Sequence, residues 1–242
     1  MTTVIYFFSG TGNSFKIAEA LSKKIGNARV IPVSAADPED LDGVSSVGLV
    51  FPVLMFGIPV YVRDFLKKTA SGFDGKYAFF VASNGGNVAG SFSQIARLVK
   101  SGHGRSSYHS FVVARKNFNR EEFDRRVDEI AASVGAEKIV QAERRSFSDR
   151  VILTGILNVL GNAMMRRAFT ASEKCTGCGS CYKLCPANNI TMVDGKPRWS
   201  THCNVCYGCV NWCPSKAIQA KLDPAYYYRS PLVESASELH IR

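Results

Sequence analysis

The first 174 residues of this 242-residue chain contain no cysteine, and all eight cysteines lie between Cys175 and Cys213. Disulfides that stabilise a secreted domain are distributed through it, so this arrangement argues against a disulfide framework. Thiols concentrated in one segment of a protein from a reducing compartment are typical of metal ligands. We therefore expect a metal-binding module near the end of the sequence.

Long apolar runs are also missing. The most apolar uncharged stretch, 151–165, has fifteen residues, whereas a membrane-spanning helix needs about 20. The N-terminal segment MTTVIYFFSG has no basic residues ahead of its short apolar run, unlike a signal peptide. We expect a cytoplasmic protein without a membrane span. We also expect 151–168 to form an apolar helix that packs between domains, with a dimer partner or a substrate pocket as the alternatives.

Several nucleotide and nucleic-acid signatures are absent. The chain has neither GxGxxG nor GxxxxGK[ST], so the dinucleotide-binding and Walker fingerprints do not apply. The net charge is +10, but it is spread along the chain without a dense Lys/Arg run or a nucleic-acid-binding motif. A diffuse positive field of this kind speeds the encounter with an acidic partner. We therefore expect an acidic protein partner and no nucleic acid.

The eight cysteines form two copies of the spacing C-x2-C-x2-C-x3-C-P, at 175–186 and 203–214. This is the run of bacterial ferredoxins, in which three cysteines bind one [4Fe–4S] cluster and the fourth binds the other. By that rule cluster I takes Cys175, Cys178, Cys181 and Cys213. Cluster II takes Cys203, Cys206, Cys209 and Cys185.

Structural zinc is the alternative interpretation of the cysteines, because paired CxxC motifs also bind zinc. A zinc site needs four ligands, and it does not require a third cysteine two residues on or a Cys-Pro pair, each occurring twice. Between the two runs, 190–199 predicts two short strands around an Asp-Gly turn. We therefore predict a small α+β bacterial ferredoxin domain that carries two [4Fe–4S] clusters and transfers single electrons.

The first 150 residues alternate between strand and helix patterns. Apolar runs typical of strands lie at 3–8, 47–53, 76–82 and 110–114, and helical patterns lie at 15–25, 60–69, 92–100 and 121–134. Strands separated by helices indicate a parallel sheet that is covered on both faces. We therefore predict an α/β domain with a doubly wound parallel sheet.

A turn rich in glycine and hydroxyl side chains, SGTGNS at 9–14, follows the first predicted strand. At such a turn, backbone N–H groups, hydroxyls and the positive end of the helix can surround a phosphate. A glycine-rich turn can equally be structural, so the general pattern alone is weak. The particular string is more specific, because it resembles the FMN-phosphate loop of flavodoxins, [ST]-x-T-G-x-[ST].

Two later glycine-containing loops, at 52–59 and 83–90, fit the same resemblance. In the flavodoxin fold, the loops after strands one, three and four meet at the carboxyl edge of the sheet. The resemblance implies that 9–14 hold the FMN phosphate and that the later loops flank the flavin ring. Core packing is the alternative for Met55 and Phe56. The implied FMN-binding residues are Ser9, Gly10, Thr11, Gly12, Asn13, Ser14, Pro52, Met55, Phe56, Gly57, Ser83, Asn84, Gly85, Gly86 and Asn87.

A flavodoxin-like, doubly wound domain followed by a two-cluster ferredoxin resembles the flavodoxin–ferredoxin fusion proteins of anaerobic microbes over nearly the whole chain. That resemblance implies anaerobic electron transfer. We predict a flavodoxin-like FMN-binding domain at 1–142, a linker and apolar docking helix at 143–170, the 2[4Fe–4S] ferredoxin domain at 171–222 and a tail at 223–242.

The leading hypothesis is an iron–sulfur flavoprotein relay. Its clusters exchange single electrons with an external low-potential carrier, and FMN couples them to two-electron steps. The expected partner is an acidic ferredoxin or flavodoxin, or a redox enzyme. The rival is a flavin-dependent reductase of a quinone, nitro compound or enone that uses NAD(P)H or ferredoxin. A redox sensor that responds to cluster loss is a third class, and we find no DNA- or partner-binding element for it. The sequence names no catalytic residue, donor, acceptor or oligomeric state.

Overall fold

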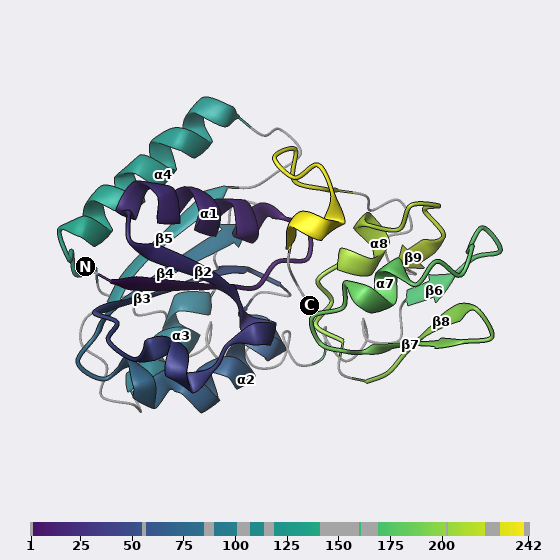
Figure 1. The fold of residues 1–242 in the computed structure, drawn as a ribbon, viewed down its shortest axis with the longest axis horizontal. Helices are drawn as coiled ribbons and strands as arrows, with labels where there is room; N and C mark the ends of the chain where they lie inside the picture. The colour runs from purple at the N-terminus through teal and green to yellow at the C-terminus, as the bar shows by residue number, and fades with distance from the viewer. Residues whose placement is uncertain are drawn as a thin grey trace.

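Figure 1 shows an α/β domain on the left and a smaller part on the right. They belong to a computed structural model of the chain. It describes residues 2–54, 57–84, 90–100, 107–113, 119–140, 160, 169–201, 203–220 and 228–239.

The α/β domain is built on a five-stranded sheet in which every neighbouring pair is parallel. The strand order is β2-β1-β3-β4-β5. This is the flavodoxin-like order, whose ligand site lies at the carboxyl edge where β1 and β3 diverge. The predicted fold class is therefore confirmed. The strands are β1 Thr3–Phe7, β2 Ala28–Pro32, β3 Ser46–Pro52, β4 Tyr77–Asn84 and β5 Ser107–Val113.

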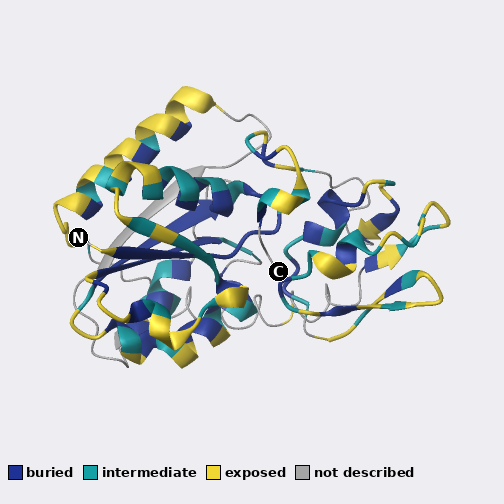
Figure 2. Ribbon diagram, viewed as in Figure 1, coloured by how far each residue is buried: buried dark blue, intermediate teal, exposed yellow. Residues whose placement is uncertain are grey.

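Two pairs of helices cover the two faces of the sheet (Figure 1). The helices are α1 Asn13–Ile25, α2 Val60–Thr69, α3 Ser91–Lys100 and α4 Arg120–Gly135. On one face, α1 and α4 pack against Ile5, Phe7 and Phe79, whereas α2 and α3 pack against Tyr6 and Phe80 on the other. Alternate strand residues thus enter opposite cores, and Figure 2 shows the strands buried between the helices.

Short elements complete this domain. The 3-10 helices η1 Val33–Ala35 and η2 Pro38–Leu41 follow β2, and η3 Ala70–Phe73 follows α2. The sequence patterns missed β2, because Ala28–Pro32 is a short edge strand that contains an arginine and a proline and is only partly buried.

The smaller part contains two antiparallel strand pairs and two single-turn helices. Strand β6 Phe169–Ala171 pairs with β9 Ile218–Ala220, and β7 Ile190–Val193 pairs with β8 Lys196–Trp199. The predicted hairpin at 190–199 is present, and positive φ angles of 49° at Asp194 and 71° at Gly195 suit its Asp-Gly turn. The helices are α7 Ser180–Lys183 and α8 Gly208–Asn211, and η5 Ala236–Leu239 lies in the C-terminal tail.

Two sequence predictions concern apolar segments. Within the described ranges, no helix has both the length and the apolar character that a bilayer crossing requires. The predicted apolar helix at 151–168 lies outside the described residues, apart from the exposed Leu160. The domain boundaries stay predictions, although β6 begins at Phe169, two residues before the predicted start of the ferredoxin domain.

Candidate cofactor sites

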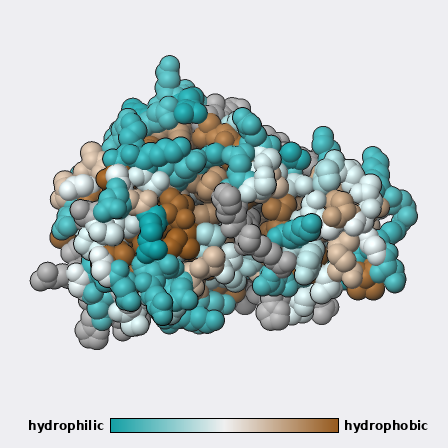
Figure 3. All heavy atoms as spheres, viewed as in Figure 1, coloured by the Kyte–Doolittle hydropathy of each residue, from teal (hydrophilic) through white to brown (hydrophobic). Residues whose placement is uncertain are grey.

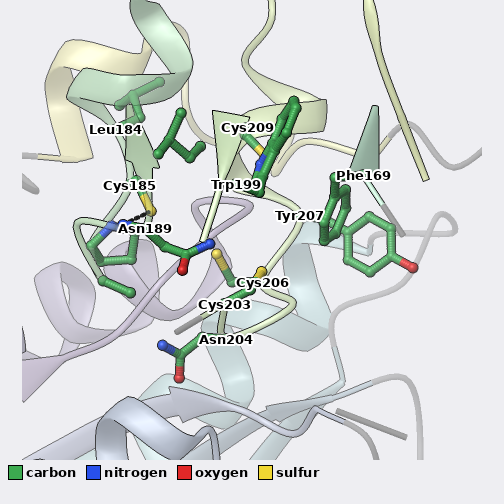
Figure 4. A pocket seen from close by; sticks show the side chains of 13 residues that line it. Phe169, Leu184, Cys185, Asn189, Trp199, Cys203, Asn204, Cys206, Tyr207 and Cys209 are labelled. Carbon is green, nitrogen blue, oxygen red and sulfur yellow. Dashed lines mark hydrogen bonds between the residues drawn. The ribbon is translucent and has the colours of Figure 1, made fainter. Parts of the chain in front are cut away.

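Two cavities open among the cysteines. The outer cavity is lined by Cys175, Cys178, Cys181 and Cys213. The inner cavity, drawn in Figure 4, is lined by Cys185, Cys203, Cys206 and Cys209. Each cavity thus combines three cysteines of one run with the last cysteine of the other run. This is the grouping that the ferredoxin spacing predicts, and the ligation of clusters by these thiols stays a prediction.

Backbone amides donate hydrogen bonds to three cysteine sulfurs, which are the last of the first run and the first and last of the second run. Asn189 N donates to Cys185 Sγ, Val205 N to Cys203 Sγ and Ala217 N to Cys213 Sγ, each over 3.3 Å. Amide hydrogen bonds to sulfur stabilise thiolate ligands and help to set cluster potentials. The chain therefore supplies donors that suit a negatively charged iron–sulfur centre.

The thiols differ in how easily they ionise. Burial raises the pKa of Cys206 to about 12 and that of Cys181 to about 11. The Ser180 hydroxyl, 3.4 Å from Cys178 Sγ, lowers the pKa of that more exposed thiol. Burial also raises the pKa of Cys209. Because a cysteine binds a metal as its thiolate, metal binding at the buried cysteines would release protons.

Each cavity is lined by four thiols, three from one run and one from the other. Across the described ranges, no three His, Cys, Asp or Glu side chains converge closely enough to hold one metal ion. Four thiols that line one cavity without converging on a single point fit a four-iron cubane, in which each iron takes one cysteine.

The loop at 9–14 connects β1 to α1, as predicted. Ser9 and Ser14 are buried, and Ser9 Oγ accepts a hydrogen bond from Gly12 N over 3.1 Å. Ser14 Oγ lies 2.8 Å from Ser83 Oγ and so joins the loop to the end of β4. Gly12 has a φ of 98°, which only glycine adopts without strain.

The N-terminal end of α1 is free of side chains that would neutralise its attraction for an anion. No side chain caps this helix, and its first turn contains no acidic residue. The first amides of a helix lack partners within it, and the helix dipole gives them positive character. Together with the buried hydroxyls, this arrangement fits a phosphate group.

Some of the other predicted flavin residues are described by the structure, and the rest are not. Pro52 ends β3 and pairs in register with Ser83, and Gly57 forms an antiparallel bridge with Leu54. The structure thus brings the ends of β1, β3 and β4 to one edge of the sheet. The side chain of Asn84 is not described, and Met55, Phe56, Gly85, Gly86 and Asn87 lie outside the described residues.

The inner cavity abuts the predicted phosphate loop. A Cβ atom on Gly10 would lie 2.1 Å from the Cys206 carbonyl oxygen, so no larger residue fits there without movement of the backbone. Trp212 Nε1 donates to the Gly10 carbonyl oxygen over 2.9 Å, and Gly208 also approaches Gly10 closely. The second cysteine run is therefore in direct contact with the loop after β1.

A second contact joins the same run to α2. Tyr61 N donates to Asn204 Oδ1 over 2.6 Å. Pro59, at the N-cap position of α2, provides no side-chain cap, so Asn204 acts as the cap of α2 from the other domain. Sequence patterns missed this role, because the two residues are 143 positions apart and no local signal connects them.

The C-terminal tail covers the predicted phosphate loop. Ser230 N donates to Thr11 O over 2.8 Å, and Val233 lies so close to Gly12 that a Cβ there would be 2.7 Å from its side chain. Lys16 on α1 pairs with Glu238 over 2.9 Å. The hydrogen bond from Lys16 lowers the pKa of Glu238 to about 2. Sequence analysis assigned no structure to this tail.

Burial raises the pKa of Tyr228, and a hydrogen bond with the Asn13 side chain opposes that rise. Thr11, Gly12 and Asn13 of the predicted phosphate loop therefore all contact the tail.

Comparisons with known proteins found one matching family and several similar solved structures. Residues 168–218 match the family described as the 4Fe-4S dicluster domain. A search of curated proteins found no match. Similar solved structures include a flavodoxin from the domain Archaea, with 16% identity, 55% of this chain and 99% of that chain covered, and a TM-score of 0.47. The flavodoxin of Streptococcus pneumoniae TIGR4 has 18% identity, with 57% and 99% covered and a TM-score of 0.47.

The Megasphaera elsdenii flavodoxin has 16% identity, with 54% of this chain and 99% of that chain covered and a TM-score of 0.45. At such low identities the fold assignment rests on the strand order of the sheet and not on any of these neighbours. The chain therefore joins a flavodoxin-like α/β domain to a 4Fe–4S dicluster domain.

Proposed function

We propose that the protein is an electron-transfer relay that holds FMN and two [4Fe–4S] clusters. The observation that carries this proposal is the contact between the inner cavity and the predicted phosphate loop. The Cys206 backbone touches Gly10 so closely that a methyl group does not fit between them. Electron transfer slows steeply with distance, so direct contact between two cofactor sites favours exchange between them.

The flavin side of the relay rests on 9–14. The uncapped first turn of α1 and the buried hydroxyls of Ser9 and Ser14 would bind the FMN phosphate. The loops that contain Pro52–Gly57 and Ser83–Asn87 would flank the ring, as the flavodoxin resemblance implies. When bound, FMN supplies the coupling of one-electron to two-electron chemistry. The chain supplies placement and shields the site from water.

The iron–sulfur side rests on the two cysteine groups. We propose that the outer cavity holds cluster I on Cys175, Cys178, Cys181 and Cys213. The inner cavity would hold cluster II on Cys185, Cys203, Cys206 and Cys209. All eight thiols are free of disulfides, which supports a reducing, cytoplasmic setting. We propose the domain limits 1–142, 143–170, 171–222 and 223–242, with the third extended to Phe169 by β6.

Two measurements test this function. Anaerobically purified protein should contain one FMN and about eight irons and eight sulfides per chain, by the two-cluster rule. In stopped-flow mixing, a reduced ferredoxin should bleach the flavin quickly, and NADH or NADPH should do so slowly. Stoichiometric zinc without acid-labile sulfide would contradict the cluster assignment. Rapid bleaching by NAD(P)H that persists after cluster removal would make the protein a flavin reductase.

A further inference from the structure

The two cysteine runs share one spacing but have different surroundings. Between Cys203 and Cys213 no residue carries a charge, and Val205 and Trp212 are 1% and 6% exposed. In the first run, by contrast, Thr176 and Cys178 are exposed. The inner cavity lies against Gly10 of the predicted phosphate loop, whereas Thr176 and Cys178 bring the wall of the outer cavity to the surface.

On the surface beside the outer cavity, exposed basic residues outnumber the exposed acidic residues Glu173 and Asp194. Lys174, Lys183 and Lys216 are all exposed, and each lies within three positions of a cysteine that lines the outer cavity. Two contacts hold this region together. Ser172 N donates to Ala217 O over 2.9 Å, and a Cβ on Gly177 would lie 2.9 Å from Gly195 O.

Exposed apolar side chains accompany these lysines. Tyr182 is 41% exposed and Val193 is 45% exposed, on the elements α7 and β7, which contact each other. In Figure 3 the right-hand part of the molecule shows hydrophobic and strongly hydrophilic residues side by side. We call this surface the outer face, defined as Lys174, Tyr182, Lys183, Val193 and Lys216.

We propose that the outer face is the docking site of a small acidic electron-carrier protein, and that electrons enter or leave the chain through the outer cavity. An apolar centre with charged residues around it is the usual anatomy of a protein interface. Positive charges there complement an acidic partner and steer its approach. This inference rests on the proposed relay function and adds to it the place and the chemistry of the partner.

The inner cavity is a less suitable place for a carrier to exchange electrons, because the flavodoxin-like domain already contacts the cysteine run that lines it. Gly10, Tyr61 and the bond between Trp212 and Gly10 fill the approach. In each encounter at the outer face the carrier loses one electron and the chain gains one, or the reverse, and no bond is made or broken. The order of sites is then carrier, outer cavity, inner cavity and flavin site.

The experiment uses the full-length, cofactor-loaded protein under anaerobic conditions. The probe is a plant-type [2Fe–2S] ferredoxin chosen for its net negative charge. A carbodiimide, which joins carboxylates to contacting lysines, links the two proteins, and mass spectrometry maps the links. We expect links at Lys174, Lys183 or Lys216. Links concentrated at Lys67 and Lys68, or no complex at all, would overturn the docking proposal.

Matched charge reversals provide the second readout. Lys174→Glu with Lys183→Glu should slow association of the probe roughly tenfold or more, because electrostatic steering is worth about one to three orders of magnitude. The control, Lys67→Glu with Lys68→Glu, changes the net charge equally on exposed lysines of α2. An equal slowing by both pairs would mean that only net charge matters. Cofactor content and flavin reduction by dithionite test the relay function separately, since neither depends on where the carrier docks.

Discussion

The two cysteine runs illustrate how one motif acquires two roles. The run at 203–213 is uncharged and contacts Gly10 and α2, whereas the run at 175–185 reaches the surface beside exposed lysines. The spacing of the cysteines is the same in both. The difference between them therefore comes from the residues between the cysteines, which make one run an interdomain contact and leave the other accessible.

The largest expected effect tests whether the two cavities are separate cluster sites with crossed ligands. Cys213→Ala should remove the outer cluster, and Cys185→Ala should remove the inner one. Each variant should keep about four of the roughly eight irons that the two-cluster rule predicts. Iron analysis and EPR of the reduced protein measure this. If Cys213→Ala spared the cluster of Cys175, Cys178 and Cys181 and lost the other, the crossed assignment would be wrong.

The next effect tests the contact that distinguishes the inner run. Gly10→Ala places a methyl group 2.1 Å from a backbone oxygen, so the two domains must separate locally. We expect a loss of about 1–3 kcal/mol in the free energy of unfolding, as for other overpacked sites. Denaturant unfolding of cluster-loaded, FMN-free protein measures it.

Gly135→Ala is the control for this variant, because a Cβ there has no neighbour within 4 Å. We expect it to leave stability unchanged or slightly raised, since alanine favours a helix more than glycine does. Equal stability of the two variants would show that the domains do not meet at Gly10 in solution.

A smaller effect concerns the cap that crosses between domains. Asn204→Ala should cost about 0.5–2 kcal/mol, the usual value for a lost helix cap. Asn119→Ala removes a comparable cap within one domain, where Asn119 Oδ1 accepts from Glu122 N over 3.0 Å. Only Asn204→Ala should accelerate limited proteolysis between the two domains. The same acceleration in both variants would reduce Asn204 to an ordinary stabilising residue.

The smallest effect concerns the tail that covers the phosphate loop. Glu238→Gln removes the charge that pairs with Lys16 and should increase hydrogen exchange at Ser230 N, which donates to Thr11 O. The pKa of Glu238 is lowered to about 2 from an ordinary 4.5. Its contribution is therefore complete above pH 4.5 and disappears as the pH falls toward 2.

Glu173→Gln breaks a more exposed Lys–Glu pair, with Lys196, outside the tail and serves as the control. We expect it to leave the exchange of Ser230 N unchanged at pH 7. If both substitutions changed that exchange equally, the Lys16–Glu238 pair would not be what holds the tail.

Sequence reasoning predicted what local patterns encode. The cysteine spacing, the Asp194–Gly195 hairpin and the SGTGNS turn are contained within about a dozen residues each, so their chemistry can be read directly. The contacts of Gly10 with Cys206 and of Tyr61 with Asn204 join residues that are far apart in the chain, and they depend on how two domains pack. The edge strand β2 was missed because partial burial leaves little apolar pattern to detect.

The central claim is that electrons reach the flavin through the inner cavity. Stopped-flow flavin reduction by the [2Fe–2S] ferredoxin in Cys185→Ala, with FMN content matched to the wild type, tests it most directly. Cys185 lines the inner cavity and is the cysteine that the other run contributes to it. We predict that flavin bleaching becomes at least about tenfold slower, while dithionite still reduces the bound flavin. An unchanged rate without the inner cluster would contradict the claim.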